Sequence, residues 1–244
     1  QGAFIKIGSL SYAPFQGVVA TDVRVYSEPE HLREISRLEA VVLDFDKTKL
    51  ARGVVHLNKI ALNHARLVLP VDPKNPHSDT LDVSDASGTL FMPGERRLEI
   101  RDARGKIAGI EVSLNARLIG YQNDGSSPPG DSNMGKRREL LARVINELEK
   151  WSFDETRPPV INITIEGDVN IRSSITAKMS LQVRDMEKNG RRLDEVSAEA
   201  DMSGDILTIT SLRATDSRGA FQGHVDYNLQ AKEGRFDVLS SLEV

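Results

Sequence analysis

The stretch VINITIEGDVNIRSSITAKMSLQVRD, residues 160–185, alternates apolar and polar side chains almost without a break. The apolar side chains fall on odd positions: Ile161, Ile163, Ile165, Val169, Ile171, Ile175, Ala177, Met179, Leu181 and Val183. Because successive side chains of a strand point to opposite faces of a sheet, the pattern predicts strands with one apolar and one polar face. The short Arg-Ser-Ser segment in the middle predicts a hairpin turn between two such strands.

The same alternation recurs in other parts of the chain. Two further segments show it: one has its apolar side chains at Ile110, Val112, Leu114 and Leu118, and the other at Phe221, Val225, Tyr227 and Leu229. Gly, Asp, Asn and Ser separate such segments at short intervals. This texture predicts a mainly β protein with mostly antiparallel strands.

One segment has a helical period instead. Residues 125–133, GSSPPGDSN, have the composition of a loop that can cap a following helix. In residues 134–151, MGKRRELLARVINELEKW, the apolar side chains form one stripe: Leu140, Leu141, Val144, Ile145, Leu148 and Trp151. We expect an amphipathic helix that packs against the sheet, and shorter helical turns at residues 28–36 and 48–53.

The expected helix separates two β-rich halves that resemble each other. Residues 98–118 and 207–229 both run through a polar turn and two glycines into a long alternating strand. The alignment places Gly105 and Gly109 over Gly219 and Gly223. The expected parts are a β-rich half at 1–124, a loop and helix at 125–159, and a second β-rich half at 160–244.

The composition limits the classes of function. Among 244 residues, Lys+Arg 32 stand against Asp+Glu 36, so we expect no nucleic-acid partner, which needs a basic face. No apolar run approaches the ~20 residues that a membrane-spanning helix needs. The chain has no cysteines, which excludes disulfides and thiolate metal sites. It opens inside a strand-like pattern, QGAFIKIGSL, and we expect it to be an excised part of a longer protein.

The stretch VVLDFDKTK, residues 41–49, raises the hypothesis of a phosphotransferase. Its Asp-x-Asp-x-Thr resembles the motif in which haloacid-dehalogenase-type enzymes present a nucleophilic aspartate. Such an enzyme needs parallel strands alternating with helices, whereas the residues after Asp46 continue mostly as strand. We therefore interpret Asp44 as a polar side chain on the exposed edge of a strand, and expect neither enzymatic activity nor a cofactor.

The five histidines are scattered through the sequence. His56 and His64 would share one face of an unbroken strand, but ~26 Å apart at the rise of a strand. That is too far to share a metal ion, so we expect no metal site.

The composition leaves the role of the apolar faces open. An apolar sheet face must be buried against another layer, curve onto itself, or bind an apolar partner. A closed sandwich or barrel and an open sheet with an apolar groove both satisfy this requirement.

The order of segments resembles the AsmA-like family, the AsmA-, TamB- and YhdP-type proteins of bacteria with two membranes. The resemblance is carried by LREISRLEAVVLDFDKTKLARGVVHLNKIALNHARLVLP (32–70) and LDVSDASGTLFMPGERRLEIRDARGKIAGIEVSLNARL (81–118). It continues through VINITIEGDVNI (160–171) and LDEVSAEADMSGDILTITSLRATDSRGAFQGHVDYNL (193–229). It covers nearly the whole chain and rests on the succession of strands and turns, with no catalytic motif.

The resemblance implies a long curved antiparallel sheet, a half-pipe or groove, built from two related β-rich halves with one amphipathic helix between them. Family members are held in the inner membrane by an N-terminal helix, extend into the periplasm, and are thought to carry phospholipid acyl chains towards the outer membrane. We accordingly expect a periplasmic location, an anchor before Gln1, further strands after Val244, and a phospholipid or other acyl-chain lipid as partner. The candidate groove residues are Ile110, Val112, Leu114, Ile161, Ile163, Ile165, Met179, Leu181, Val183, Val225, Tyr227 and Leu229.

The alternative is a closed β-sandwich scaffold that mediates protein–protein interaction in the cell envelope without binding lipid. A continuous apolar groove would favour lipid binding, and two closed cores would favour the scaffold. An enzyme acting on polysaccharide is less favoured, because the aromatic residues that form sugar-binding platforms are few (Trp 1, Tyr 4, Phe 7).

Overall fold

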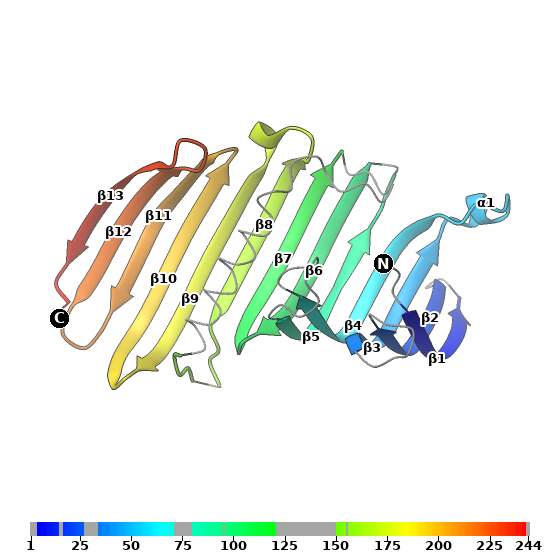
Figure 1. Cartoon of the computed structure of the whole chain (residues 1–244), viewed down its shortest axis with the longest axis horizontal. Helices are drawn as coiled ribbons and strands as arrows, with labels where there is room; N and C mark the ends of the chain where they lie inside the picture. The colour runs from blue at the N-terminus through cyan, green and yellow to red at the C-terminus, as the bar shows by residue number, and fades with distance from the viewer. Residues whose placement is uncertain are drawn as a thin grey trace. The chain divides into compact units, whose positions relative to one another are not determined.

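The computed structural model describes residues 4–14, 17–26, 34–70, 80–94, 96–120, 150–154 and 156–242. Nearly all regular structure in these ranges is β-strand (Figure 1). The chain divides into two compact units, whose described residues are 4–108 in unit 1 and 109–120 with 150–242 in unit 2. In each unit the strands follow one another in sequence order in an open sheet. The prediction of a mainly β, open and curved sheet is confirmed.

The described residues of unit 1 form six strands, and each pairs with the next in antiparallel orientation where the register is given. They are β1 (Phe4–Ala13), β2 (Gly17–Tyr26), β3 (Glu34–Phe45), β4 (Leu57–Pro70), β5 (Thr80–Phe91) and β6 (Arg97–Ile107).

One face of unit 1 is apolar, and its side chains align from strand to strand. One row consists of Ile7, Val23, Leu38, Ala65 and Ala86. The next row consists of Leu10, Ala20, Val41, Leu62 and Gly88. In β1 to β4 these rows are three residues apart, although strict alternation would put them two residues apart. The strands therefore carry an extra residue between the rows.

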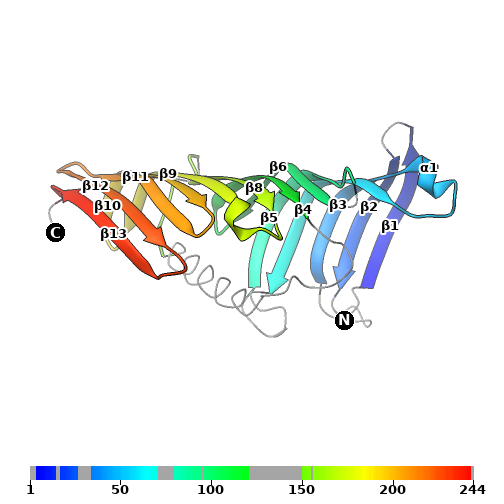
Figure 2. The ribbon, with the colours of Figure 1, turned by 90° about the horizontal axis from the view of Figure 1, so that it is seen from above.

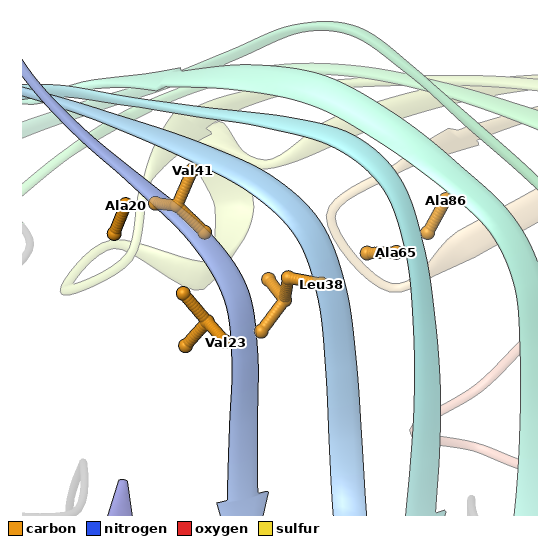
Figure 3. Packing of buried hydrophobic residues seen from close by; sticks show 6 residues of the cluster. All are labelled: Ala20, Val23, Leu38, Val41, Ala65 and Ala86. Atoms are coloured by element: carbon orange, nitrogen blue, oxygen red, sulfur yellow. The ribbon is translucent and has the colours of Figure 1, made fainter. Parts of the chain in front are cut away.

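The extra residues bend the strands. Asp22 in β2 and His64 in β4 both have φ 46, and Asp85 and Asp102 in the next two strands both have φ 51. Asp and His are among the few residues other than glycine that adopt such a left-handed conformation readily. Because an extra residue in a strand bends it locally, the strands turn sharply along this line (Figures 2 and 3).

The core of unit 1 lies on the inner side of this bend (Figure 3). It consists of Ala20, Val23, Leu38, Val41, Ala65 and Ala86. Small and branched side chains fit here because the two halves of each strand converge on the same space. By bending, a single sheet buries part of its own apolar face.

A short helix, α1 (Lys47–Leu50), follows β3 and agrees with the helical turn expected at residues 48–53. The Asp46 carboxylate caps it by accepting hydrogen bonds from the backbone amides of Thr48 (2.9 Å) and Lys49 (3.0 Å). The amide of Lys49 makes the largest contribution that holds the pKa of Asp46 below its usual value. Of the other expected helical turn, Glu34–Ser36 is instead the start of β3, and residues 28–33 lie outside the described ranges.

In the part of unit 2 that the structure describes there are seven strands and a short 3₁₀ turn, η2 (Arg172–Ser174). The strands are β7 (Ile110–Ile119), β8 (Val160–Asp168), β9 (Thr176–Lys188), β10 (Arg191–Ser203), β11 (Ile206–Thr215), β12 (Ala220–Asn228) and β13 (Glu233–Ser240). The hairpin predicted from the Arg-Ser-Ser segment is confirmed, because β8 and β9 pair in antiparallel orientation across η2. The pairing of β7 with β8 is parallel, and residues 120–159 between the two strands are numerous enough for the crossover that such a pairing requires.

The expected amphipathic helix at 134–151 lies almost wholly outside the described residues. Its last expected member, Trp151, lies in a bend, with the Lys188 ammonium 5.1 Å from the centre of its ring. Ser152 then pairs with Glu187 of β9 through two backbone hydrogen bonds of 2.8 and 2.9 Å. Residues 151 and 152 therefore lie beside the end of β9.

The glycine alignment between the two halves does not pair glycines of the same structural role. Gly109 lies in the turn before β7, and Gly219 lies just before β12. Gly105 and Gly223 lie inside β6 and β12. The aligned pairs therefore match a strand glycine with a turn glycine.

We predict that Ala65→Leu lowers the free energy of unfolding by about 1–3 kcal/mol, because Ala65 is 1% exposed and the bend leaves no room for a larger side chain. Urea denaturation measures the change. Ala61→Leu is the matched control, since Ala61 lies on the opposite face of β4, where it pairs with Val42. If both substitutions have the same effect, the core does not lie on the inner side of the bend.

Candidate functional site

Apolar residues of unit 2 form three rows that run across its seven described strands, with glycine at one position in each of two rows. The first row consists of Val112, Ile161, Leu181, Ala198, Leu212, Gly223 and Val238. The second consists of Leu114, Ile163, Met179, Ala200, Ile209, Val225 and Phe236. The third consists of Ala116, Ile165, Ala177, Met202, Leu207, Tyr227 and Gly234. We call this set the apolar face of unit 2.

The apolar face contains no charged side chain in these rows. Six spacings between seven neighbouring strands give it a width of ~29 Å in the direction of the hydrogen bonds. Ile209 and Leu212 of β11 both lie on this face although they are three residues apart, because a β-bulge between them adds one residue to the strand.

All twelve residues predicted from the sequence lie on the strands of unit 2 or directly beside them. Nine are members of the three rows. A tenth, Val183, pairs with Val196 as a further apolar step of β9 and β10. Ile110 is the first residue of β7, two positions before Val112 in the same alternation. Leu229 directly follows β12, and its backbone amide donates to the carbonyl of Asp205. The structure thus brings residues from β7, β8, β9 and β12 to one surface.

The burial of these residues is uneven. Ile110 and Val183 are 3% and 4% exposed and belong to the core, whereas Met179 and Leu229 are 42% and 37% exposed. The other eight candidates are half-buried. The sequence did not separate the buried members from the accessible ones.

The buried members lie towards one end of the strands. Pro159, which is fully buried, accepts a 2.8 Å hydrogen bond from the amide of Glu111, next to Ile110. Met186, 7% exposed, lies near Val183 at the end of β9, where Ser152 pairs with the strand. This end of the face is packed. Along the three rows most side chains are partly exposed, and the small Ala116 and Ala200 are buried.

The opposite face of the same strands is polar. The Ser113 hydroxyl donates to Asn162 Oδ1 at 2.6 Å, and Asn162 Nδ2 donates to the Ser180 hydroxyl at 3.1 Å. Further along, the Thr208 hydroxyl donates to Asp226 at 2.9 Å. That hydrogen bond, together with the ring of His224, holds the pKa of Asp226 below its usual value. One sheet therefore separates an apolar from a hydrogen-bonded polar surface.

The residues that raised the phosphotransferase hypothesis have structural roles. Asp44 lies in antiparallel β3 opposite Lys59 of β4, and Asp46 caps α1. His64 lies at the bend of β4, and His56 precedes the strand. Within the described ranges, no group of three or more His, Asp or Glu side chains is placed to hold a metal ion.

Sequence reasoning missed the contributions of β10 and β11. The residues are Ala198, Ala200 and Met202 in β10 and Leu207, Ile209 and Leu212 in β11. The signal was present in LDEVSAEADMSGDILTITSL (193–212), where Val196, Ala198, Ala200 and Met202 alternate with polar residues. Alanine is only weakly apolar and so marks the face poorly. The β-bulge between Ile209 and Leu212 also shifts the alternation by one residue, which hides the apolar side chains of β11 that follow it.

Comparison of the chain with models of protein families, with curated protein sequences and with solved structures finds no match. The resemblance to AsmA-like proteins therefore stays a prediction. In the described part of the chain, no helix has the length and apolar character needed to cross a membrane.

We predict that Ile110→Ala lowers the free energy of unfolding by about 2–5 kcal/mol, the usual cost of truncating a buried isoleucine. Met179→Ala removes a side chain from the accessible part of the same face and should cost much less. Urea denaturation of both variants measures the difference. Equal losses would contradict the division of the face into a packed end and an accessible part.

Proposed function

We propose that this chain is a non-enzymatic, lipid-binding segment of a periplasmic protein that takes part in phospholipid transport or outer-membrane biogenesis. Acyl chains bind along the apolar face of unit 2, and the full protein is anchored in the inner membrane. The observation that carries the proposal is the set of three apolar rows that run across seven strands while most of their side chains stay partly exposed.

The physical argument begins with the cost of exposed apolar surface. Contiguous apolar patches are rare on soluble proteins and mark a place where another apolar surface binds. An acyl chain fits such a face because each methylene that leaves water contributes about 0.8 kcal/mol. The rows offer many similar aliphatic side chains and no single dominant contact, so a bound chain can shift along the face at little cost.

The open form of the sheet is compatible with a bound lipid. A lipid has a polar headgroup that must remain hydrated while its chains are buried. An open sheet allows this, since its border exposes the headgroup to water. The succession of strands that resembles AsmA-like proteins supports the assignment to the cell envelope and the inner-membrane anchor.

The closed-sandwich scaffold has less support. In the described residues of unit 2 the strands form one sheet, with no second sheet packed against the apolar face. A scaffold with a sealed core would need such a layer.

We predict that the chain purified from bacterial membranes carries phospholipid, detected by native mass spectrometry and lipid extraction. Met179→Asp places a charge in the middle row of the apolar face and should remove most of the bound lipid while the protein stays folded. Ser180→Asp is the matched control, because Ser180 is the next residue of β9 and lies on the polar face. The control should retain lipid.

Two results would argue against this function. One is a folded, lipid-free wild-type protein, and the other is equal lipid content in the Met179→Asp and Ser180→Asp variants. Circular dichroism of each variant establishes that loss of lipid is not loss of folding.

A further inference from the structure

The connection between β3 and β4, residues 46–56, forms a compact loop beyond the ends of both strands (Figure 1). We call it the 46–56 tip. The amide of Asp46 donates to the carbonyl of His56 at 2.9 Å and closes the loop at its base. At the end of α1, the amides of Gly53 and Val54 donate to the carbonyls of Leu50 (2.9 Å) and Lys49 (3.0 Å). With Gly53 at φ 78, this is a Schellman motif, which ends a helix with its last carbonyls satisfied.

The tip exposes three aliphatic side chains. Leu50, Val54 and Val55 are 47%, 54% and 72% exposed. In a Schellman motif the residue after the glycine often packs back against the helix, but here Val54 is largely in water. Backbone hydrogen bonds hold the loop in shape without contacts from these side chains. The conformation of the loop therefore gives no reason for three aliphatic side chains to lie in water.

The same loop carries an excess of positive charge. Lys47, Lys49 and Arg52 supply three cations, and Asp46 supplies one anion, which gives a charge of +2 on a chain whose formal net charge is −4. No ion pair of the three cations occurs in the described part of the chain. Lys47 and Arg52 are exposed and can meet an external anion, whereas Lys49 is half-buried and lies close enough to Asp46 to lower the pKa of that carboxyl.

Two other strand ends of unit 1 carry side chains of the same kinds. Antiparallel pairing brings the end of β1 and the start of β6 to the same end of unit 1 as the tip. Tyr12 is exposed there, as are Arg96 and Arg97. An aromatic and two more cations thus lie at the same end as the aliphatic side chains of the tip.

We propose that the 46–56 tip docks unit 1 onto the surface of a membrane that contains anionic phospholipid. Segments that bind in the membrane interface combine aliphatic or aromatic side chains, which enter the acyl boundary, with Lys and Arg, which contact the headgroups. Anionic lipid attracts such cations, and the attraction decays within a Debye length. This inference concerns unit 1 alone and does not rest on acyl-chain binding by unit 2.

A single labelled cysteine tests the proposal directly, because the chain has no cysteine of its own. Val55→Cys, labelled with the environment-sensitive fluorophore NBD, should shift its emission to shorter wavelength with vesicles of phosphatidylcholine and phosphatidylglycerol in equal parts. Vesicles of phosphatidylcholine alone should give little change. Ile171→Cys, labelled in the same way in a turn of unit 2, should not respond to either.

Two sets of variants separate the contributions of charge and apolar contact in vesicle cosedimentation. Replacing Lys47, Lys49 and Arg52 by Ala should weaken binding to the anionic vesicles roughly a hundredfold, at about fivefold for each cation. The charge-matched control replaces Lys178, Arg213 and Lys232 by Ala. Val54→Ser with Val55→Ser should also weaken binding, whereas Ile171→Ser with Ile206→Ser, both 53% exposed in the parent chain, should not.

The outcomes distinguish this proposal from the acyl-chain site. Met179→Asp should still bind anionic vesicles, and the tip variants should still carry co-purified lipid. Vesicle binding that survives the tip variants, or a labelled Val55→Cys protein that responds to a protein fraction of the envelope and not to vesicles, would overturn membrane docking by the tip.

Discussion

The hydrogen-bonded register of unit 2 is the constraint on which its surface chemistry depends. Because side chains alternate between faces, a slip of one residue in any strand would move that strand's apolar side chains to the polar face. The row that runs from Leu114 through Met179 to Phe236 stays unbroken only if every neighbouring pair keeps its register. The turn at Asn189 and Gly190, with φ 53 and 77, has the positive φ values of a two-residue hairpin that aligns β9 with β10.

The apolar faces of the two units differ in how they are buried. In unit 1, extra residues at Asp22 and His64 bend the strands, and the inner side of the bend buries a cluster of small and branched side chains. In unit 2 the large buried side chains lie at one end, near Ile110 and Val183, and most members of the rows beyond it stay partly exposed, although Ala116 and Ala200 are buried. The same alternating sequence pattern therefore produces a self-buried core in one place and a partly exposed apolar face in another.

Much of the fold could be predicted from alternation. The strands around 160–184 and their apolar face follow from period two, as does the mainly antiparallel character of the sheet. The bend was not predicted, although it left a signal: the apolar spacing changes from two to three at Asp22 and at His64. The parallel pairing of β7 with β8 could not be read from sequence, because it depends on a long connection and not on local side chains.

The candidate site was partly predictable for a related reason. Alternation identifies which side chains share a face of one strand, and this placed residues such as Met179 and Val225 correctly on one surface. It does not show how deeply each is buried, since burial depends on what other segments pack against the sheet. Ile110 and Met179 have the same pattern in sequence and opposite exposures in the structure.

The central claim is that acyl chains lie on one face of unit 2. Photo-crosslinking tests it most directly, with a photoreactive amino acid placed in turn at residues 178 to 182 of β9 in cells, followed by mass spectrometry of the adducts. The account predicts lipid adducts at positions 179 and 181 and none at 178, 180 and 182. Adducts at all five positions, or at none, would contradict it.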